Sequence, residues 1–378
     1  MIQLGFFGKV LEKHFLLLNL TLLTPESLKM KPVVLLRPTV CVLAGLVCLM
    51  CVHIYFILKL SNKELHTRTI HHMTRHHLIS KTTHRRHYNR SVYPSFGHMK
   101  YILNNPDVCH SSKEVTVLFV VHSAWNQTRQ RQVMRQTFLN QTYFPQHTVK
   151  SVFLLGLNTY NQSNEIIEME NAVHGDIIQG DFMDTYHNLT YKFSLGLQWM
   201  VGFCLNVKFV IKIDDDTVMD TFRFLERYLP KYQNKRRHLI CNVWSKNTMG
   251  IIRKRRFAVS WDILKGYNVY PWRYCSGFVV VLTGDLIPLL YKSLFISPML
   301  WVDDVYLSGQ LPSRLDNVTY IGLRPQEMYY SYNRHFRRKT KCLGLPGCEL
   351  LVFEDKYGYD DYYWKILLYN RGLSTIQV

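Results

Sequence analysis

The chain has 378 residues, is 47% hydrophobic and 19% charged, and carries a formal net charge of +19. This length and composition exclude a wholly disordered chain and support one large domain or two ordinary ones. Residues 1–60 carry +4 of the net charge, residues 61–100 carry +7, and residues 101–378 carry the remaining +8. Because the densest charge lies in a short segment outside any expected core, we expect no nucleic-acid partner.

The first 110 residues are predicted to tether the chain to a membrane. Residues 40–60 are almost entirely apolar, and about 20 such residues span a bilayer core. We therefore expect a cytosolic tail at 1–39, which begins at Met1 or Met30, and a single transmembrane signal-anchor at 40–60. Residues 61–110 are expected to form an extended lumenal stem, because this basic and histidine-rich segment has few large apolar residues to bury.

Sequons and cysteines indicate the compartment of the part after the anchor. Six Asn-x-Ser/Thr sequons follow it, as in a chain that enters a glycosylating compartment. Six cysteines also follow it, an even number that can close three disulfides, although six reduced buried thiols are the alternative. We therefore expect a type II orientation with the C-terminal part in the lumen. The sequons begin at Asn89, Asn126, Asn140, Asn161, Asn188 and Asn317, and the cysteines are Cys109, Cys204, Cys241, Cys275, Cys342 and Cys348.

Strand and helix patterns alternate in the region after the stem. Continuous apolar runs indicate strands buried on both faces, and apolar residues at helical spacing indicate helices between them. This alternation predicts an α/β fold with a mostly parallel sheet, in which ligands bind beyond the carboxyl ends of the strands. The expected strands are 114–121, 151–155, 175–178 and 208–213, and the expected helices are 128–138, 164–173, 186–201 and 217–229.

Three adjacent aspartates, Asp214, Asp215 and Asp216, directly follow the expected strand 208–213. Adjacent carboxylates repel one another, and their burial is costly unless a cation or solvent compensates it. A divalent metal with oxygen ligands would compensate them, and it would also neutralise a pyrophosphate. The alternative is a solvated turn in which Asp216 or Asp220 caps the next helix. The triplet alone does not decide between these interpretations.

A second acidic pair, Asp303 and Asp304, lies about 90 residues downstream among apolar neighbours. A carboxyl group in such surroundings has a raised pKa, which suits a general base. The alternative is the N-terminus of a helix, where aspartate is favoured.

Several motifs follow one another in a fixed order. They are RQVMRQTF at 131–138, FLLG at 153–156, DIIQGDFMDTYHNLTYK at 176–192, KIDDD at 212–216, YPWRYCSG at 270–277 and DDVY at 303–306. This ordered set resembles the β-1,3-glycosyltransferase family (glycosyltransferase family 31), which contains β-1,3-galactosyltransferases and β-1,3-N-acetylglucosaminyltransferases. The resemblance covers roughly residues 114–355 within a catalytic domain expected at 111–378.

The resemblance implies a GT-A fold, a UDP-sugar donor, a Mn²⁺ ion and inversion at the anomeric carbon. It implies that Asp216 and Asp214 engage the metal and that Asp304 is the catalytic base. Many members have a metal-binding histidine near the C-terminus, where this chain has Phe353-Glu354, so Glu354 or His335 is expected to substitute. The donor-binding residues that the resemblance implies are Asp214, Asp215, Arg131 and Lys192, with salt bridges inside the domain as the alternative role of Arg131 and Lys192.

We therefore expect a single-pass Golgi enzyme that transfers a hexose or N-acetylhexosamine, galactose first among them, from a UDP-sugar. The acceptor would be the 3-hydroxyl of a glycan on a glycolipid or glycoprotein. The alternative is an inactive lumenal glycan-binding or chaperone protein on the same fold. From the positions of the motifs, we expect a disulfide between Cys204 and Cys275. A second disulfide is expected to close the short loop between Cys342 and Cys348.

Overall fold

The computed structural model describes residues 99–375, apart from residues 111, 160, 256, 331–339, 356, 357 and 359. The predicted cytosolic tail, the predicted anchor and most of the predicted stem lie outside these residues, as does His335. Among the described residues, no helix is long and apolar enough to cross a bilayer. The described residues belong to one compact unit.

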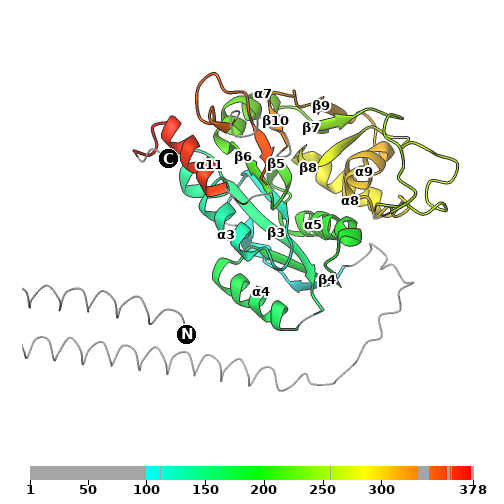
Figure 1. The fold of residues 1–378 in the computed structure, drawn as a ribbon. Coiled ribbons are helices and arrows are strands. Elements are labelled where there is room, and N and C mark those ends of the chain that lie inside the picture. The colour runs from blue at the N-terminus through cyan, green and yellow to red at the C-terminus, as the bar shows by residue number, and fades with distance from the viewer. Residues whose placement is uncertain are drawn as a thin grey trace, which may run out of the picture. The chain divides into compact units, whose positions relative to one another are not determined.

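An eight-stranded mixed sheet forms the centre of this unit, in the order β1-β4-β3-β2-β5-β8-β7-β9 (Figure 1). Strands β4, β3, β2 and β5 are parallel, whereas β8 runs antiparallel between β5 and β7. The predicted α/β fold is therefore confirmed, with a parallel half and a mixed half. The strands are β1 (Tyr101–Leu103), β2 (Val115–His122), β3 (Val149–Leu157), β4 (Ile177–Met183), β5 (Val207–Asp214), β7 (His238–Trp244), β8 (Tyr274–Thr283) and β9 (Thr319–Gly322).

Strand β2 is buried on both faces, as its continuous apolar sequence predicts. Phe119 and Val121 belong to one hydrophobic cluster, and the alternate residues Leu118 and Val120 belong to a second cluster. Successive side chains of a strand point to opposite faces of its sheet, so these two clusters are the cores on the two sides.

Helices cover both faces of the sheet. In Figure 1, α3 and α11 lie to the left of the sheet, and α5 and α8 lie to its right. Met134 of α3 packs into the first cluster, and Trp199 of α5 packs into the second. The helices are α3 (Thr128–Gln136), α4 (Asn161–His174), α5 (Leu189–Phe203), α6 (Thr221–Arg223), α7 (Leu229–Tyr232), α8 (Ile287–Leu294), α9 (Asp303–Val305) and α11 (Asp360–Asn370). The 3₁₀ and π-helical turns are η1 (Pro106–Val108), η2 (Gln141–Tyr143), η3 (Tyr186–Asn188), η4 (Phe224–Tyr228), η5 (Gly284–Leu286), η6 (Tyr306–Gln310) and η7 (Pro312–Arg314).

The predicted helix at 217–229 is wrong in its first turn. Residues Thr217–Met219 form strand β6, which pairs with β11 (Val352–Glu354) in a small second sheet completed by β10 (Met328–Tyr329). The helical segment starts only after Asp220, whose Oδ1 accepts a hydrogen bond from the Arg223 backbone N–H at 2.9 Å. The partner of β6 lies far along the chain, so the local pattern does not show the pairing.

The six cysteines of the domain form three disulfides, as their even number predicted. Cys109 pairs with Cys204, Cys241 with Cys275, and Cys342 with Cys348. The expected Cys342–Cys348 bond is confirmed, and the expected Cys204–Cys275 bond is wrong. Cys204 ends α5 and faces the segment after β1, whereas Cys275 lies on β8 beside β7.

The segment before residue 111 takes part in the fold. Strand β1 pairs antiparallel with β4, and Cys109 is disulfide-bonded to the end of α5. A domain drawn from residue 111 onwards omits this edge strand and this crosslink. Residues 101–109 therefore pack with the rest of the domain.

Candidate active site

A pocket of about 520 Å³ opens where β2 and β5 end. Its walls come from the turns after these strands, from η3, from β8 and from α9. Acidic side chains from several segments converge on it. They are Asp184, Asp214, Asp215, Asp216, Asp303, Asp304 and Glu354.

Asp214, Asp215 and Asp216 form the turn after β5, here called the aspartate turn. A buried lysine holds this turn at the pocket. Lys212 Nζ donates a hydrogen bond to Asp214 Oδ1 at 2.6 Å and another to the backbone carbonyl of Gly277. Although burial opposes it, the Asp214 and Asp303 carboxylates raise the pKa of Lys212, so this side chain stays charged. Burial raises the pKa of Asp214 to about 7, and Lys212 opposes that shift. Asp215 Oδ2 accepts a hydrogen bond from the Ala124 backbone N–H at 3.2 Å.

The second acidic pair starts helix α9, which confirms the helix N-terminus, while the role of general base stays a prediction. Asp303 is buried, and burial with the neighbouring Asp304 carboxylate raises the pKa of Asp303 to about 6. Asp304 lines the pocket, and burial raises its pKa too, against the opposing charge of Lys212. A carboxylate with a raised pKa is a stronger proton acceptor than one in water, which suits a general base.

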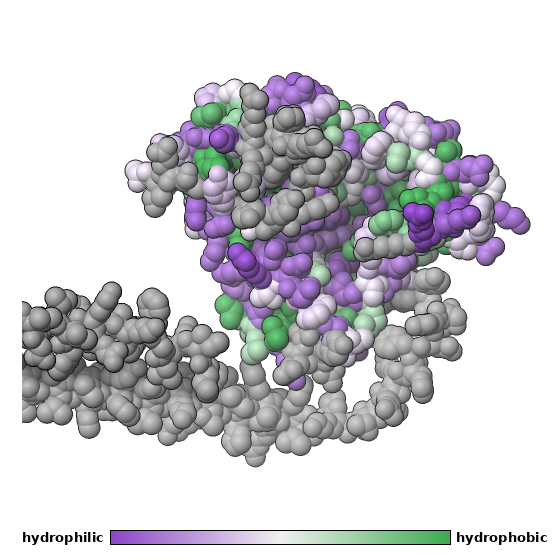
Figure 2. Space-filling model, in the orientation of Figure 1, coloured by the Kyte–Doolittle hydropathy of each residue, from purple (hydrophilic) through white to green (hydrophobic). Residues whose placement is uncertain are grey.

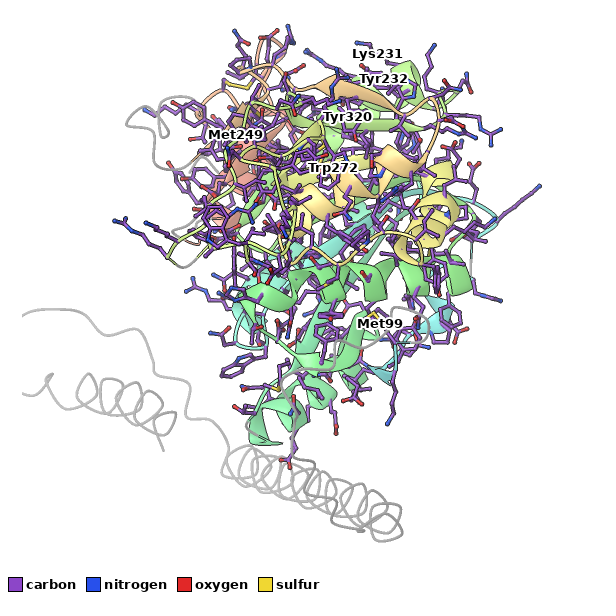
Figure 3. All side chains as sticks on the ribbon, turned by 90° about the vertical axis from the view of Figure 1, so that its right-hand side faces the viewer. Met99, Lys231, Tyr232, Met249, Trp272 and Tyr320 are labelled. Atoms are coloured by element: carbon purple, nitrogen blue, oxygen red, sulfur yellow. A yellow bond between two sulfur atoms is a disulfide. The ribbon has the colours of Figure 1, made fainter. Side chains whose placement is uncertain are left out.

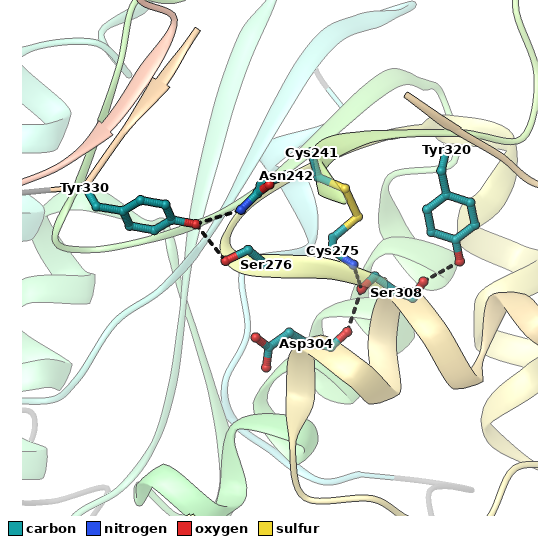
Figure 4. The surroundings of a disulfide bond; sticks show 8 residues. All are labelled: Cys241, Asn242, Cys275, Ser276, Asp304, Ser308, Tyr320 and Tyr330. Carbon is teal, nitrogen blue, oxygen red and sulfur yellow. Dashed lines mark hydrogen bonds between the residues drawn. A yellow bond between two sulfur atoms is a disulfide. The ribbon is translucent and has the colours of Figure 1, made fainter. Parts of the chain in front are cut away.

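Two contacts fix Asp304 in place (Figure 4). Ser308 Oγ donates to the Asp304 carbonyl at 2.5 Å and accepts from the Cys275 backbone N–H at 2.8 Å. Gly277 leaves room for the side chain, since an added Cβ would lie 3.1 Å from Asp304 Oδ2. Strand β8, which carries the Cys241–Cys275 disulfide, therefore holds the backbone of Asp304 through Ser308 and leaves room for its carboxylate at Gly277.

The two predicted basic residues lie at different depths. Lys192 lines the pocket, where its Nζ donates to Asp184 Oδ1 at 2.7 Å and to the Ser123 carbonyl at 2.6 Å. Arg131 is fully buried behind the pocket, where it pairs with Glu170 at 2.6 Å and donates to the Ala124 carbonyl at 2.6 Å. Arg131 thus forms an internal salt bridge and hydrogen-bonds to the turn after β2.

The donor atoms at the aspartate turn suit a hard divalent cation. Glu354, on β11, pairs in register with Thr217 and lines the same pocket as Asp216. Carboxylate oxygens are the ligands that Mn²⁺ and Mg²⁺ prefer, so the residues present fit such an ion. Among the described residues, no three carboxylate, imidazole or thiolate groups already converge as a preformed metal site.

Sequence reasoning missed His122, which ends β2 beside Asp214 in the sheet. Its Nδ1 lies 3.9 Å from Asp303 Oδ2, and within the described part of the chain neither ring nitrogen has a hydrogen-bond partner. Burial, with Lys212 and Lys192, holds the pKa of His122 well below its ordinary value, so the ring is neutral. The sequence contains one signal for this residue, because His122 is a polar residue at the end of a continuous apolar strand.

The sequence model of the galactosyltransferase family matches residues 129–320. The chain belongs to the galactosyltransferase family. This match contains the aspartate turn and the Asp303-Asp304 pair, and the predicted family is therefore confirmed.

Curated members of this family resemble the chain over part of their length. Human β-1,3-galactosyltransferase 1 is 28% identical over 209 residues, which cover 55% of this chain and 63% of the relative. β-1,3-Galactosyltransferase 2 of Pongo abelii is 32% identical over 224 residues, which cover 57% of this chain and 51% of the relative. The chain thus spans less than two thirds of these relatives.

Solved structures align only weakly with this galactosyltransferase-family chain. The apo WbbM bifunctional glycosyltransferase aligns with a TM-score of 0.36 and 9% identity, and the alignment covers 69% of this chain and 52% of that chain. A similarity this low supports no conclusion.

Proposed function

We propose that the chain transfers galactose from UDP-galactose to the 3-hydroxyl of a glycan acceptor, with inversion, on a GT-A-type fold. The observation that carries this proposal is the common pocket of the aspartate turn and the Asp304 carboxylate. Family membership and the similarity to β-1,3-galactosyltransferases support the choice of galactose.

Asp304 is the proposed general base. Inversion by a single displacement needs one carboxylate to accept the acceptor hydroxyl proton while the hydroxyl oxygen attacks the anomeric carbon and UDP leaves from the opposite face. Ser308 holds the Asp304 backbone, and the Gly277 backbone hydrogen-bonds to the carboxyl group, so the proposed base has a defined position. A removed base costs about 10²–10⁴ in rate.

The donor side of the pocket is the aspartate turn. Asp216, Asp214 and Glu354 would hold a divalent metal, which supplies positive charge that stabilises the diphosphate. Asp215 links the turn after β5 to the turn after β2 by a hydrogen bond. Lys192 links the turn after β2 to Asp184. Both residues thereby maintain the geometry of the donor site. Lys212 offsets the repulsion between the pocket's carboxylates by placing a fixed cation among them.

The secretory lumen is the proposed location. Three disulfides within one domain are typical of an oxidising compartment, and the sequons agree with it. A type II membrane anchor at 40–60 completes this proposal and places the catalytic domain in the Golgi lumen.

The test uses the full chain, expressed in cultured secretory cells and purified in detergent. UDP-galactose, UDP-N-acetylglucosamine and UDP-N-acetylgalactosamine are offered with galactoside and N-acetylglucosaminide acceptors, with Mn²⁺ or with EDTA. We expect transfer from UDP-galactose that EDTA abolishes and that falls at least about 100-fold in Asp304→Asn. Asp316→Asn, at an exposed aspartate outside the pocket, is the matched control.

Two further measurements separate the parts of the proposal. Asp216→Asn and Glu354→Gln should each weaken Mn²⁺ binding in the presence of UDP, measured by electron paramagnetic resonance. Full transfer by Asp304→Asn would refute the assignment of the base. Glycan binding without turnover of any of the three donors would instead favour a glycan-binding protein.

A further inference from the structure

Four aromatic side chains from three separate segments meet beside the Asp304 pocket. Tyr186 and His187 come from η3, Phe257 from the loop between β7 and β8, and Trp301 from the segment before α9. The ring centroids of Tyr186 and Phe257 are 5.5 Å apart, those of Tyr186 and Trp301 are 6.1 Å apart, and those of His187 and Trp301 are 4.4 Å apart. We call this set the aromatic wall.

The aromatic wall is open to solvent and continuous with the pocket. Tyr186 is 45% exposed and Phe257 is 42% exposed, so both rings are accessible to a ligand. Tyr186 lines the pocket together with Asp304, and Trp301 precedes Asp304 by three residues. Tyr186 therefore joins the wall to the pocket that contains the proposed base.

One arginine holds the loop that carries Phe257. Arg253 Nη1 donates to the carbonyls of Val259, Ser260 and Ile263, and its Nη2 donates to those of Leu264 and Tyr267, at 2.6–3.3 Å. Because a single guanidinium satisfies so many main-chain acceptors, the loop has a fixed shape without regular secondary structure.

This loop protrudes at the right of Figure 1, where Figure 2 shows hydrophobic and hydrophilic residues side by side. Figure 3 faces it, with Met249 and Trp272 labelled near its two ends. The hydrogen bonds of Arg253 thus hold the loop in the shape that places Phe257 against Tyr186.

We propose that the aromatic wall binds the second sugar ring of the glycan acceptor, next to the sugar whose hydroxyl attacks. This inference rests on the proposed function and names its substrate class, an acceptor of at least two sugar rings. Pyranose rings present apolar C–H faces that pack on aromatic rings, and the Tyr186 hydroxyl and the His187 ring supply polar atoms for the sugar hydroxyls. The donor diphosphate belongs at the carboxylates across the pocket, because its metal needs oxygen ligands.

The test compares acceptors of one and two rings with the full-length enzyme. Lactose is compared with methyl β-galactoside, and di-N-acetylchitobiose with methyl β-N-acetylglucosaminide. We expect Tyr186→Ala and Phe257→Ala to raise the KM of the two-ring acceptor about tenfold and to abolish its advantage over the one-ring acceptor. In Phe257→Ala, which lies outside the pocket lining, the KM of UDP-galactose should change less than the KM of the two-ring acceptor.

Conservative and control variants sharpen the result. Tyr186→Phe keeps the ring and should retain most of the two-ring preference. Arg253→Gln should shift the acceptor KM in the same direction as Phe257→Ala, because it frees the loop. Phe295→Ala removes another aromatic ring, 54% exposed and outside the pocket lining, and should change neither KM.

An active wild type whose acceptor KM is unchanged in both Tyr186→Ala and Phe257→Ala would overturn the inference. A wild type without turnover would overturn the proposed function instead. Saturation-transfer NMR with lactose and di-N-acetylchitobiose then tests the wall alone. Contact that Tyr186→Ala removes would support the wall, and contact that both alanine variants retain would refute it.

Discussion

Replacing Gly277 by alanine tests whether the position of the Asp304 carboxylate governs turnover. The added Cβ would lie 3.1 Å from Asp304 Cγ and Oδ2 and 3.3 Å from its Cβ. Non-bonded carbon atoms pack at about 3.5–4.0 Å, so the carboxylate must retreat by roughly 0.5 Å. A 1 Å misplacement costs about 100-fold in rate, and half of that displacement therefore costs about tenfold, or about 1.4 kcal/mol in the activation free energy.

The assay measures kcat, the KM of UDP-galactose and the melting temperature of Gly277→Ala in the full chain. We expect the fall in kcat with little change in the donor KM, since the aspartate turn is untouched. Gly322→Ala is the matched control, because Gly322 is also a strand glycine but an added Cβ there meets no heavy atom within 4 Å. A Gly277→Ala enzyme with wild-type kcat and an unchanged fold would refute the claim that β8 positions the base.

Three further predictions concern stability. Lys212→Met should lower the free energy of unfolding by about 2–3 kcal/mol in urea titrations, because it leaves buried carboxylates without their cation, whereas Lys208→Met at an exposed ion pair should cost under about 1 kcal/mol. Arg131 and Arg135 lower the pKa of Glu170 against its burial, so the stability that this carboxylate contributes is present at neutral pH and lost as the pH falls below the ordinary value of 4.5. In Glu170→Gln, the free energy of unfolding should fall less steeply as the pH drops below 4.5. An unchanged dependence of this free energy on pH would contradict the assignment. Replacing both cysteines of the 34-residue Cys241–Cys275 loop by serine should cost about 4 kcal/mol, against about 2 kcal/mol for the 6-residue C-terminal loop.

The parallel half of the sheet was predictable because its signals are local. Strands β2 and β5 are buried on both faces, so their sequences are continuous apolar runs that end at His122 and Asp214. Their carboxyl ends lie side by side, and the aspartates after β5 therefore indicate the position of the pocket from sequence alone.

The contacts that complete the site depend on residues far apart in the chain. Strand β6 looks helical by itself and becomes a strand only because β11 pairs with it, which brings Glu354 beside Asp216. Cys204 and Cys275 lie in separate motifs that flank the predicted active region, yet the partner of Cys204 is Cys109, because α5 ends beside the segment that follows β1. Pattern and spacing carry no information about such pairings.

The placement of Phe257 shows the same limit. The segment from 245 to 273 has no strong periodicity, and its shape comes from the carbonyls gathered around Arg253. Nothing in the spacing of one arginine and a later phenylalanine predicts that the ring will meet Tyr186.

The Cys241–Cys275 disulfide links the geometry around Asp304 to the oxidation of two thiols. It joins β7 to β8 next to Ser276 and Gly277, and the backbone N–H of Cys275 is tied through Ser308 to Asp304. Oxidation of these two thiols therefore fixes the strand whose backbone holds Asp304, the proposed base, through Ser308. If the proposed function holds, the geometry around the base is completed only in an oxidising compartment, where this disulfide forms.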